Sequence, residues 1–293
     1  ATASDPDYVL AEADFLLNAG LWDDTTNATL GNFIGTNLFF NAGTFRKSGG
    51  TSVSSLNWFF NTTGLMDVTN GSLSIAKWTN SSTLNGALTL SGGNITAPLT
   101  LASNSFLNWT GGSLDSLMTA SPGSALTING VQMAFNNYNL GQSNYVALSN
   151  FATVNFAGDC TGYGRAVVYN AGLWQDAGNH NFQQFTGSNV FVNAGILQKT
   201  GGALSSSIEW YFTQAGQFDL LSGNFSLSGV STQTNGTTTL NGGKLTVSSP
   251  FQLLGGTLRG TTNFTGSLTN DATVSPGLSP GQLTVTSAYN QTS

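Results

Sequence analysis

The stretch NAGTFRKSGG at residues 41–50 returns as NAGILQKTGG at residues 193–202, an offset of 152 positions (193 − 41). The likeness continues on both sides without gaps. Residues 16–30 align with 168–182, and residues 37–75 align with 189–227. A match of this length exceeds what biased composition produces, so the chain contains a tandem duplication.

A shorter period runs inside each copy and is marked by asparagine. In the first copy the steps are 23 residues (41 − 18) and 20 residues (61 − 41). Steps of this length, with Gly-rich turns and short β-type runs between them, predict a β-solenoid whose neighbouring coils pair as parallel strands. The marked positions are Asn18, Asn41, Asn61, Asn170, Asn193 and, in sixth place, Thr213.

The predicted fold is therefore all-β, a single-stranded right-handed parallel β-helix of about a dozen coils of 20–23 residues. We expect one domain over residues 1–293. Residues 1–15 are predicted as an N-terminal cap or first strand, 16–162 as the first duplicated unit and 163–293 as the second.

Strand alternation predicts which side chains face the core. The positions three and one residues before each asparagine are apolar, and both rows are predicted to point inward. These rows are Phe15, Leu38, Trp58, Val167, Val190 and Trp210, and Leu17, Phe40, Phe60, Tyr169, Val192 and Phe212. The asparagines themselves are predicted to stack coil on coil at a corner of left-handed turn geometry.

The row two residues before each asparagine is predicted to point outward. It lies on the same side of the strand as the row four residues before each asparagine, and that row is mostly polar. The row two residues before each asparagine is itself apolar in every coil, and an exposed apolar row indicates a contact surface. Its members are the candidate ligand or partner site: Leu16, Phe39, Phe59, Val168, Phe191 and Tyr211. The alternative is that an insertion of the same chain covers them.

Composition restricts the function classes. Charged residues make up 7% of the 293 residues, against roughly 25% in ordinary soluble domains. The net charge is −6 and the basic residues are scattered, so no nucleic-acid partner is expected. No apolar run approaches the roughly 20 residues of a membrane span.

The few charges have a structural interpretation. Asp24 and Lys47 are 23 residues apart (47 − 24), which places them side by side on adjacent coils, and Asp176 and Lys199 repeat the arrangement. We expect two cross-strand pairs, worth about 0.2–1 kcal/mol each if they are exposed, rather than catalytic groups.

Candidate chemistry is sparse elsewhere. GDCTGYGR at 158–165 contains Cys160 and is expected to be a loop between the two copies, while the lone His180 has no evident metal-binding partner. Asp67 and Asp219 also recur, and turns are predicted there. No catalytic residue, cofactor or metal is expected. The recurring tryptophans are predicted as core: Trp22, Trp58, Trp174 and Trp210.

The C-terminal stretch NDATVSPGLSPGQLTVTSAYNQTS (270–293) resembles the repeat of autotransporter-type and other large bacterial surface β-helix proteins. The residues that carry the resemblance are Pro276, Gly277, Ser279, Pro280, Gly281, Leu283, Val285, Tyr289, Gln291 and Thr292. The resemblance implies a secreted or cell-surface passenger, often part of a much longer chain. It brings no catalytic residues with it.

The leading hypothesis is a non-enzymatic secreted or cell-surface β-solenoid, an adhesin-like or extracellular structural module. Its partners would be a polysaccharide, a cell-surface ligand or copies of itself, because open strand edges also permit end-to-end assembly. The second hypothesis is a carbohydrate-binding module. The third is a polysaccharide lyase or glycoside hydrolase on the same fold, which would require clustered carboxylates.

Overall fold

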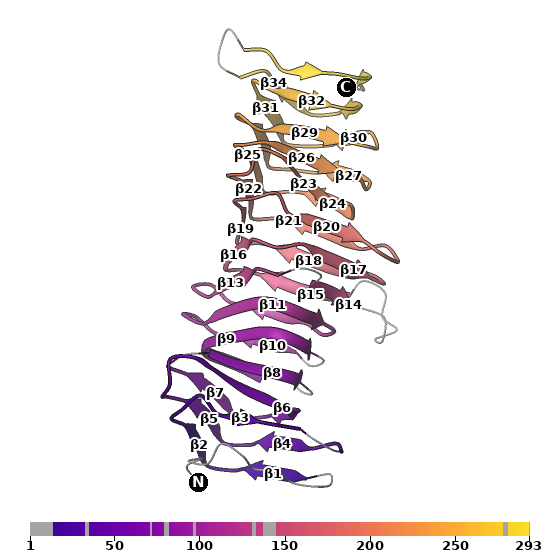
Figure 1. The fold of residues 1–293 in the computed structure, drawn as a ribbon. Coiled ribbons are helices and arrows are strands. Elements are labelled where there is room, and N and C mark those ends of the chain that lie inside the picture. Colours follow the sequence, from indigo (N-terminus) through magenta and orange to yellow (C-terminus); the bar gives the residue numbers. More distant parts are fainter. Residues whose placement is uncertain are drawn as a thin grey trace. The chain divides into compact units, whose positions relative to one another are not determined.

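The predicted fold class is confirmed. The structure, a computed structural model, describes residues 14–32, 35–70, 72–78, 82–95, 98–130, 133–136, 145–277 and 281–292. These residues contain no helix, and their parallel strands stack in about 12 coils of a β-solenoid (Figure 1).

The chain divides into two compact units, residues 1–134 and 135–293, and each is described by itself. The boundary falls within β14 (Met133–Asn136). Of the proposed cap at 1–15, only the last two residues lie within the described part of the chain. The single domain over 1–293 and the division at 162/163 stay predictions.

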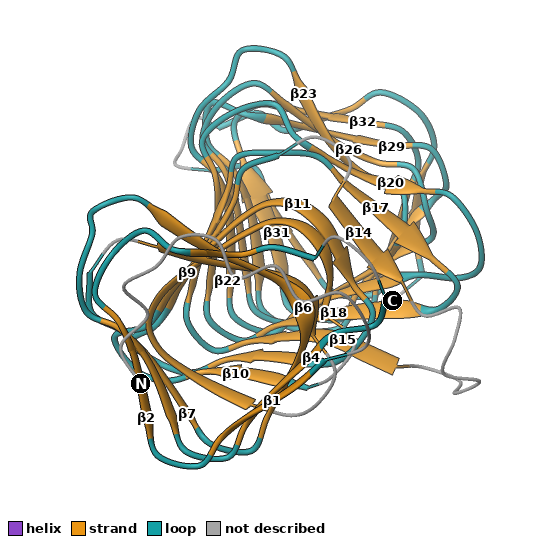
Figure 2. Cartoon of the chain, turned by 60° about the horizontal axis from the view of Figure 1, so that its bottom comes forward, coloured by secondary structure: helices purple, strands orange, loops and turns teal. Residues whose placement is uncertain are grey.

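In the second unit each complete coil consists of three strands, and each strand pairs with the third strand after it. Figure 2 shows the resulting stacks. The first face contains β15 (Tyr145–Asn150), β18 (Ala166–Asn170), β21 (Val190–Asn193), β24 (Tyr211–Gln214), β27 (Ser231–Gln233), β30 (Phe251–Leu253), β33 (Leu268–Asn270) and β36 (Tyr289–Gln291).

The other two faces of this unit follow the same order along the chain. The second face contains β16 (Thr153–Phe156), β19 (Leu173–Asp176), β22 (Ile196–Lys199), β25 (Gln217–Leu220), β28 (Thr237–Leu240), β31 (Thr257–Gly260) and β34 (Thr273–Ser275). The third contains β17 (Cys160–Tyr163), β20 (Asn181–Gln184), β23 (Ser205–Ile208), β26 (Asn224–Leu227), β29 (Lys244–Val247), β32 (Asn263–Thr265) and β35 (Thr284–Val285).

The first unit is built from the same parallel stacks, but several of its strands run on from one face into the next. Its strands are β1 (Phe15–Asn18), β2 (Leu21–Asp24), β3 (Thr29–Leu30), β4 (Leu38–Asn41), β5 (Thr44–Lys47), β6 (Val53–Thr62), β7 (Leu65–Val68), β8 (Ser72–Trp78), β9 (Ser82–Ile95), β10 (Leu99–Leu101), β11 (Phe106–Leu114), β12 (Met118–Ala120) and β13 (Ala125–Ile128). β1, β4 and the end of β6 pair in register, as do their counterparts β18, β21 and β24.

The core of each unit is filled by apolar side chains from every face. In the first unit Phe39 lies edge-on to Phe45, with ring centroids 5.7 Å apart. Trp58 and Trp210 are buried, and their indole N–H groups donate to carbonyls one coil away, Gly31 at 2.8 Å and Gln183 at 2.9 Å. The predicted core position is therefore confirmed for Trp58, Trp210 and Trp174, whereas Trp22 is half-buried.

The predicted asparagine stack exists as a ladder of side-chain hydrogen bonds inside the corner. Asn18 Nδ2 donates to Asn41 Oδ1 at 2.7 Å. In the second unit Asn150 donates to Asn170, Asn170 to Asn193 and Asn193 to Gln214, each at 2.7 Å. Most ladder amides also donate to a main-chain carbonyl of the next coil, so each buried amide is satisfied.

Two predicted ladder positions are wrong by one residue. Asn41 donates to Thr62 Oγ1 at 2.9 Å, so Thr62 rather than Asn61 continues the ladder, and the step is 21 residues (62 − 41). Gln214 likewise stands where Thr213 was expected. The left-handed corner is also wrong, because Asn104, at φ 66°, is the only non-glycine with positive φ among the described residues.

The glycine of the repeated Asn-Ala-Gly phrase is required by the close approach of successive coils. A Cβ on Gly43 would lie 2.0 Å from the carbonyl oxygen of Gly20, and one on Gly64 would lie 1.8 Å from that of Gly43. Real Cβ atoms do not approach backbone this closely, so a side chain here forces the coils apart. Among the described residues nothing lies within 4 Å of the equivalent Cβ at Gly20, the first glycine of this column in that part of the chain.

Asn41→Ala should lower the free energy of unfolding by about 1–3 kcal/mol, because Asn18 Nδ2 then loses its buried acceptor. Asn61→Ala is the matched control one coil away, with an expected change within about 0.5 kcal/mol, since the Asn61 carbonyl oxygen has no hydrogen-bond partner to lose. Urea denaturation measures both. Equal losses for the two variants would contradict the assigned register.

Gly43→Ala should destabilise the first unit by several kcal/mol or prevent its folding, because the new methyl group meets backbone rather than a movable side chain. Gly20→Ala, in the same column, should leave the thermal midpoint within a few degrees of the original, since its methyl group enters open space. Thermal unfolding followed by circular dichroism tests the pair. A smaller shift for Gly43→Ala than for Gly20→Ala would disprove the close approach.

Candidate functional site

The predicted exposed apolar row is wrong for most of its members. Phe39, Val168 and Phe191 are 0% exposed and belong to the core. Leu16 pairs in register with Phe39 and shares its inward column. Phe39, Val168 and Phe191 therefore cannot reach a ligand at the surface, and Leu16 is half-buried.

The row was assigned to the wrong side because the polar row four residues before each asparagine was assumed to be exposed. Asn37 and Asn189, taken as outward because they are polar, are buried and hydrogen-bonded instead. Asp14 N–H donates to Asn37 Oδ1 at 2.9 Å, and Ala166 N–H donates to Asn189 Oδ1 at 2.8 Å. A buried amide with satisfied hydrogen bonds is compatible with the core, so polarity alone did not indicate the outer side.

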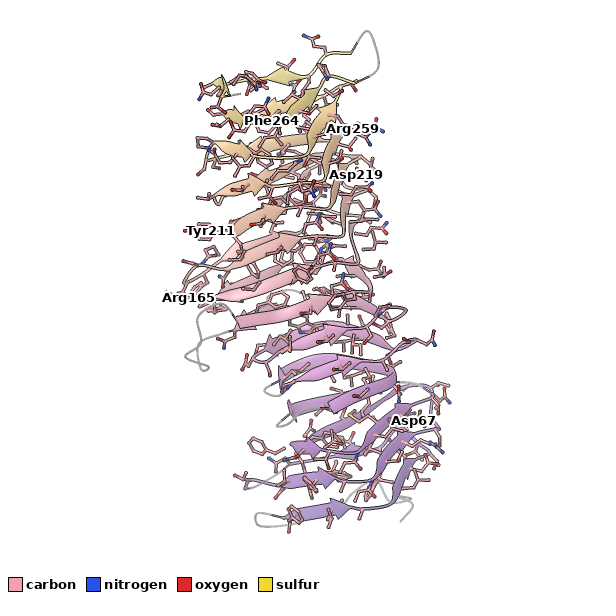
Figure 3. The ribbon with its side chains drawn as sticks, turned by 180° about the vertical axis from the view of Figure 1, so that it is seen from behind. Asp67, Arg165, Tyr211, Asp219, Arg259 and Phe264 are labelled. Atoms are coloured by element: carbon pink, nitrogen blue, oxygen red, sulfur yellow. The ribbon has the colours of Figure 1, made fainter. Side chains whose placement is uncertain are left out.

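Phe59 and Tyr211 do point outward. The ladder residue of the third coil lies one position later than predicted, so Phe59 pairs with the outward Leu38 and Tyr211 with the outward Val190. Tyr211 is 46% exposed and Phe59 is half-buried. In Figure 3, Tyr211 projects from the same side of the second unit as Arg165, and Asp219 and Arg259 project from the opposite side.

Two pairs of outward rows, here called the outer rows, take the place of the predicted site. Most of their side chains come from positions that were predicted to be inside, the exceptions being Phe59, Tyr211, Asn61 and Thr213. Phe15 and Leu17 at their start are 63% and 55% exposed. The outer rows of the first unit are Phe15, Leu38 and Phe59, and Leu17, Phe40 and Asn61. Those of the second unit are Val167, Val190 and Tyr211, and Tyr169, Val192 and Thr213.

Further aromatic side chains flank the outer rows of the second unit. Phe185 is 67% exposed, and its ring centroid lies 4.8 Å from that of Tyr163. On the other side Phe151 is exposed, and its ring centroid lies 6.2 Å from that of Tyr169. Tyr211 and the flanking phenylalanines are exposed, whereas Val167, Val190, Tyr169 and Val192 of the outer rows are half-buried.

The first charged pair is a cross-strand pair as predicted, and it lies inside the protein. Asp24 and Lys47 are register partners on β2 and β5, and both are buried. Lys47 Nζ donates to the carbonyls of Thr26 and Gly49, each at 2.7 Å. Asp24 Oδ1 accepts from Thr26 N–H at 2.9 Å, so the pair fastens the turn after each strand.

The second pair is also buried, and it belongs to a larger cluster. Lys199 Nζ lies 3.8 Å from Asp176 Oδ2. Lys199 Nζ donates to Ser206 Oγ at 2.9 Å, and Ser206 Oγ donates to Asp176 Oδ2. His180 Nδ1 lies 2.8 Å from Asp176 Oδ1. Burial lowers the pKa of Lys199, while the Asp176 carboxylate acts in the opposite direction.

Sequence reasoning missed Ser206 and the link between His180 and Asp176. Ser206 aligns with Ser54 at the offset of the duplication (206 − 54 = 152), which was the available signal. His180 aligns with Ala28 (180 − 28 = 152), so no repeat could point to it.

The remaining candidates are structural. The 158–165 stretch is not a loop, since Cys160 starts β17, where burial and the Asp159 carboxylate raise the pKa of its thiol well above the usual range. Asp67 and Asp219 lie in β7 and β25, so the predicted turns are wrong there. Asp67 Oδ2 forms an ion pair with Arg46 Nε at 2.9 Å.

The described part of the chain holds no group of three or more His, Cys, Asp or Glu side chains placed to bind a metal ion. Among the same residues no helix has the length and apolarity needed to cross a bilayer.

Comparisons with known proteins return no relative: no family model, no curated protein and no solved structure matches the chain. The assignment of function therefore depends on the geometry of the outer rows and the buried charged clusters.

Lys47→Met tests the buried ammonium through the pH dependence of stability. Burial lowers the pKa of Lys47 from 10.5 in the folded state, with the Asp24 carboxylate opposing the shift. Between the lowered value and 10.5 the unfolded chain binds more protons, so wild-type stability rises with pH by about 1.4 kcal/mol for each pKa unit of lowering. This contribution is present above pH 10.5 and is lost as the pH falls through the folded-state pKa.

The stability of the wild type relative to Lys47→Met should therefore increase as the pH rises from the lowered folded-state pKa towards 10.5, as measured by urea denaturation. Lys244→Met, at an exposed position, is the matched control for loss of one positive charge. A relative stability that falls over this range would contradict the burial of the Lys47 ammonium.

Proposed function

We propose that this chain is a non-enzymatic, secreted or cell-surface β-solenoid that acts as an adhesin-like or extracellular structural module. The observation that carries the proposal is the pair of outer rows, an apolar lateral surface that occurs in both copies of the duplication. The C-terminal resemblance to bacterial surface β-helix repeats supports the same function and location.

Stacking of strands does not by itself require an apolar outer side. Further along the first face of the second unit, one outward row is polar, with Thr232, Gln252 and Thr269, although Val230 beside it is an exposed apolar residue. The outer rows, in contrast, are apolar except for Asn61 and Thr213. An exposed apolar surface that the fold does not demand indicates a contact site.

The duplication adds a second argument. Phe15, Leu38 and Phe59 of the first copy correspond to Val167, Val190 and Tyr211 of the second. Each side chain differs between the copies, yet every one remains apolar. This pattern fits a surface whose apolar character matters more than its detailed shape, as in adhesion or lateral assembly. No charged residue occurs in the outer rows, so contact there would depend on apolar burial.

A carbohydrate-binding module is the second candidate, and the exposed aromatic rings of the second unit favour it. Tyr211 and the neighbouring Tyr163–Phe185 pair provide ring faces on which the apolar faces of sugars can pack. The enzymatic alternative has less support, because Asp24 and Asp176 are buried and occupied by structural hydrogen bonds.

The double variant Val190→Thr with Tyr211→Thr should separate these functions. If the outer rows mediate assembly, the wild type associates in a concentration-dependent way, and the variant needs at least about tenfold higher concentration, since two apolar contacts of about 1 kcal/mol each are lost. Sedimentation velocity measures this. High salt should not weaken an apolar contact.

Thr269→Ala, on the same face but outside the outer rows, is the control and should associate like the wild type. Retardation in polysaccharide-containing gels that Tyr211→Ala with Phe185→Ala abolishes would favour the carbohydrate-binding module. A protein that stays monomeric, binds no polysaccharide and releases reducing or unsaturated ends from one would overturn the proposal.

A further inference from the structure

Four side chains of the second unit meet beside the turns that follow β19 and β22. Asp176 is the last residue of β19, Lys199 is the last residue of β22, and the two are register partners. Ser206 belongs to β23, and His180 lies in the turn after β19. Asp176, Lys199 and Ser206 are buried, and His180 is half-buried.

The contacts place a nucleophile, a carboxyl carbon and a proton path together. Lys199 Nζ lies 3.8 Å from Asp176 Oδ2. Ser206 Oγ lies between these two atoms, accepting from Lys199 Nζ at 2.9 Å and donating to Asp176 Oδ2. The other carboxylate oxygen, Oδ1, accepts from Gly178 N–H at 2.8 Å and lies 2.8 Å from His180 Nδ1.

We propose that Lys199 and Asp176 condense to form an intramolecular isopeptide bond between adjacent coils. The proton of the ammonium first moves to the carboxylate, which gives a neutral amine and a carboxylic acid. The amine nitrogen attacks Cγ of Asp176, the Cγ–Oδ2 bond breaks, and Oδ2 leaves as water with its own proton and one from the nitrogen. The products are one amide and one water, so atoms and charge balance without an oxidant or a co-reactant.

Each neighbouring group has a defined role in this step. Gly178 N–H and His180 Nδ1–H donate to Oδ1, where negative charge develops when nitrogen attacks the carboxyl carbon. Ser206 Oγ can pass a proton from the attacking nitrogen to the departing Oδ2, because it contacts both atoms. Burial lowers the pKa of Lys199, which favours the neutral amine that the attack requires.

Burial also supplies the driving force. Removing an ammonium and a carboxylate from water is costly, and their mutual attraction offsets that cost only in part. Condensation replaces both charges by a neutral amide and releases the water. The bond would be independent of whatever the outer rows contact, and its presence or absence does not decide the proposed function.

The first unit provides a natural control for the chemistry. Asp24 and Lys47 repeat the pair, but Ala28 stands where the second unit has His180. Lys47 Nζ donates to the carbonyls of Thr26 and Gly49, and Lys199 Nζ makes the equivalent contact to the carbonyl of Gly178, so the two pairs differ at the carboxylate rather than at the lysine. Ser54 Oγ donates to the Thr26 carbonyl at 3.4 Å rather than to the carboxylate. With neither the His nor the Ser contact to its carboxylate, this pair is expected to remain unlinked.

The mass of the denatured full chain tests the proposal directly. We expect a species lighter than the sequence mass by one water, and tandem mass spectrometry of its digest should find two peptides joined through Asp176 and Lys199. The full sequence mass would overturn the proposal. So would a water loss confined to Asp176 with an unmodified Lys199, which indicates a succinimide, and so would a link between Asp24 and Lys47 in place of the expected one.

Two variants test the roles of the neighbours. Lys199→Met removes the nucleophile and should restore the full variant mass. His180→Ala reproduces the first unit at a half-buried position, and the linked fraction measured at a fixed time after purification should fall at least tenfold. An unchanged linked fraction in His180→Ala would overturn the assigned role of His180. Because the wild-type mass decides the main question, a variant that fails to fold does not leave it open.

Discussion

The whole structure depends on one constraint: each coil lies directly on the next, at the spacing of hydrogen-bonded strands. Residues about one coil apart in sequence therefore become nearest neighbours, and like side chains stack. Asparagine suits this arrangement because its amide both donates and accepts, so a column of asparagines satisfies itself. Glycine suits the adjoining position, where successive backbones approach too closely for a Cβ.

The same constraint accounts for the low charge content. A repeated charged residue would stack on its own copy and be repelled, whereas repeated Asn, Thr, Ser or Gly incurs no such penalty. Where charges do occur in register they have opposite signs, as in the Asp24–Lys47, Arg46–Asp67 and Asp176–Lys199 pairs. Two of these three pairs are buried, where they hold turns in place or, as we propose, become a covalent link.

The coil period could be predicted from the sequence because asparagine and glycine have special roles at the corner. The direction of the side chains could not, for two reasons. Asn37 and Asn189 are polar but buried, so they misled an inference that equated polarity with exposure. The shortened third coil then moved the ladder from Asn61 to Thr62, and no sequence signal distinguishes these two polar neighbours. The candidate contact surface is therefore formed by the opposite side of most strands from the one predicted. Of the six predicted site residues, only Phe59 and Tyr211 point outward as expected.

The shorter third coil has a consequence for how such a chain can change over time. Between Asn41 and Thr62 the coil is two residues shorter than the one before it, yet the ladder and the strand pairing continue. Turns therefore absorb insertions and deletions, whereas a single residue added within a strand would exchange its inner and outer sides. A gene encoding this fold can lengthen by whole coils or vary its corners freely, and we expect insertions among relatives to concentrate at the turns and to be rare inside the strands.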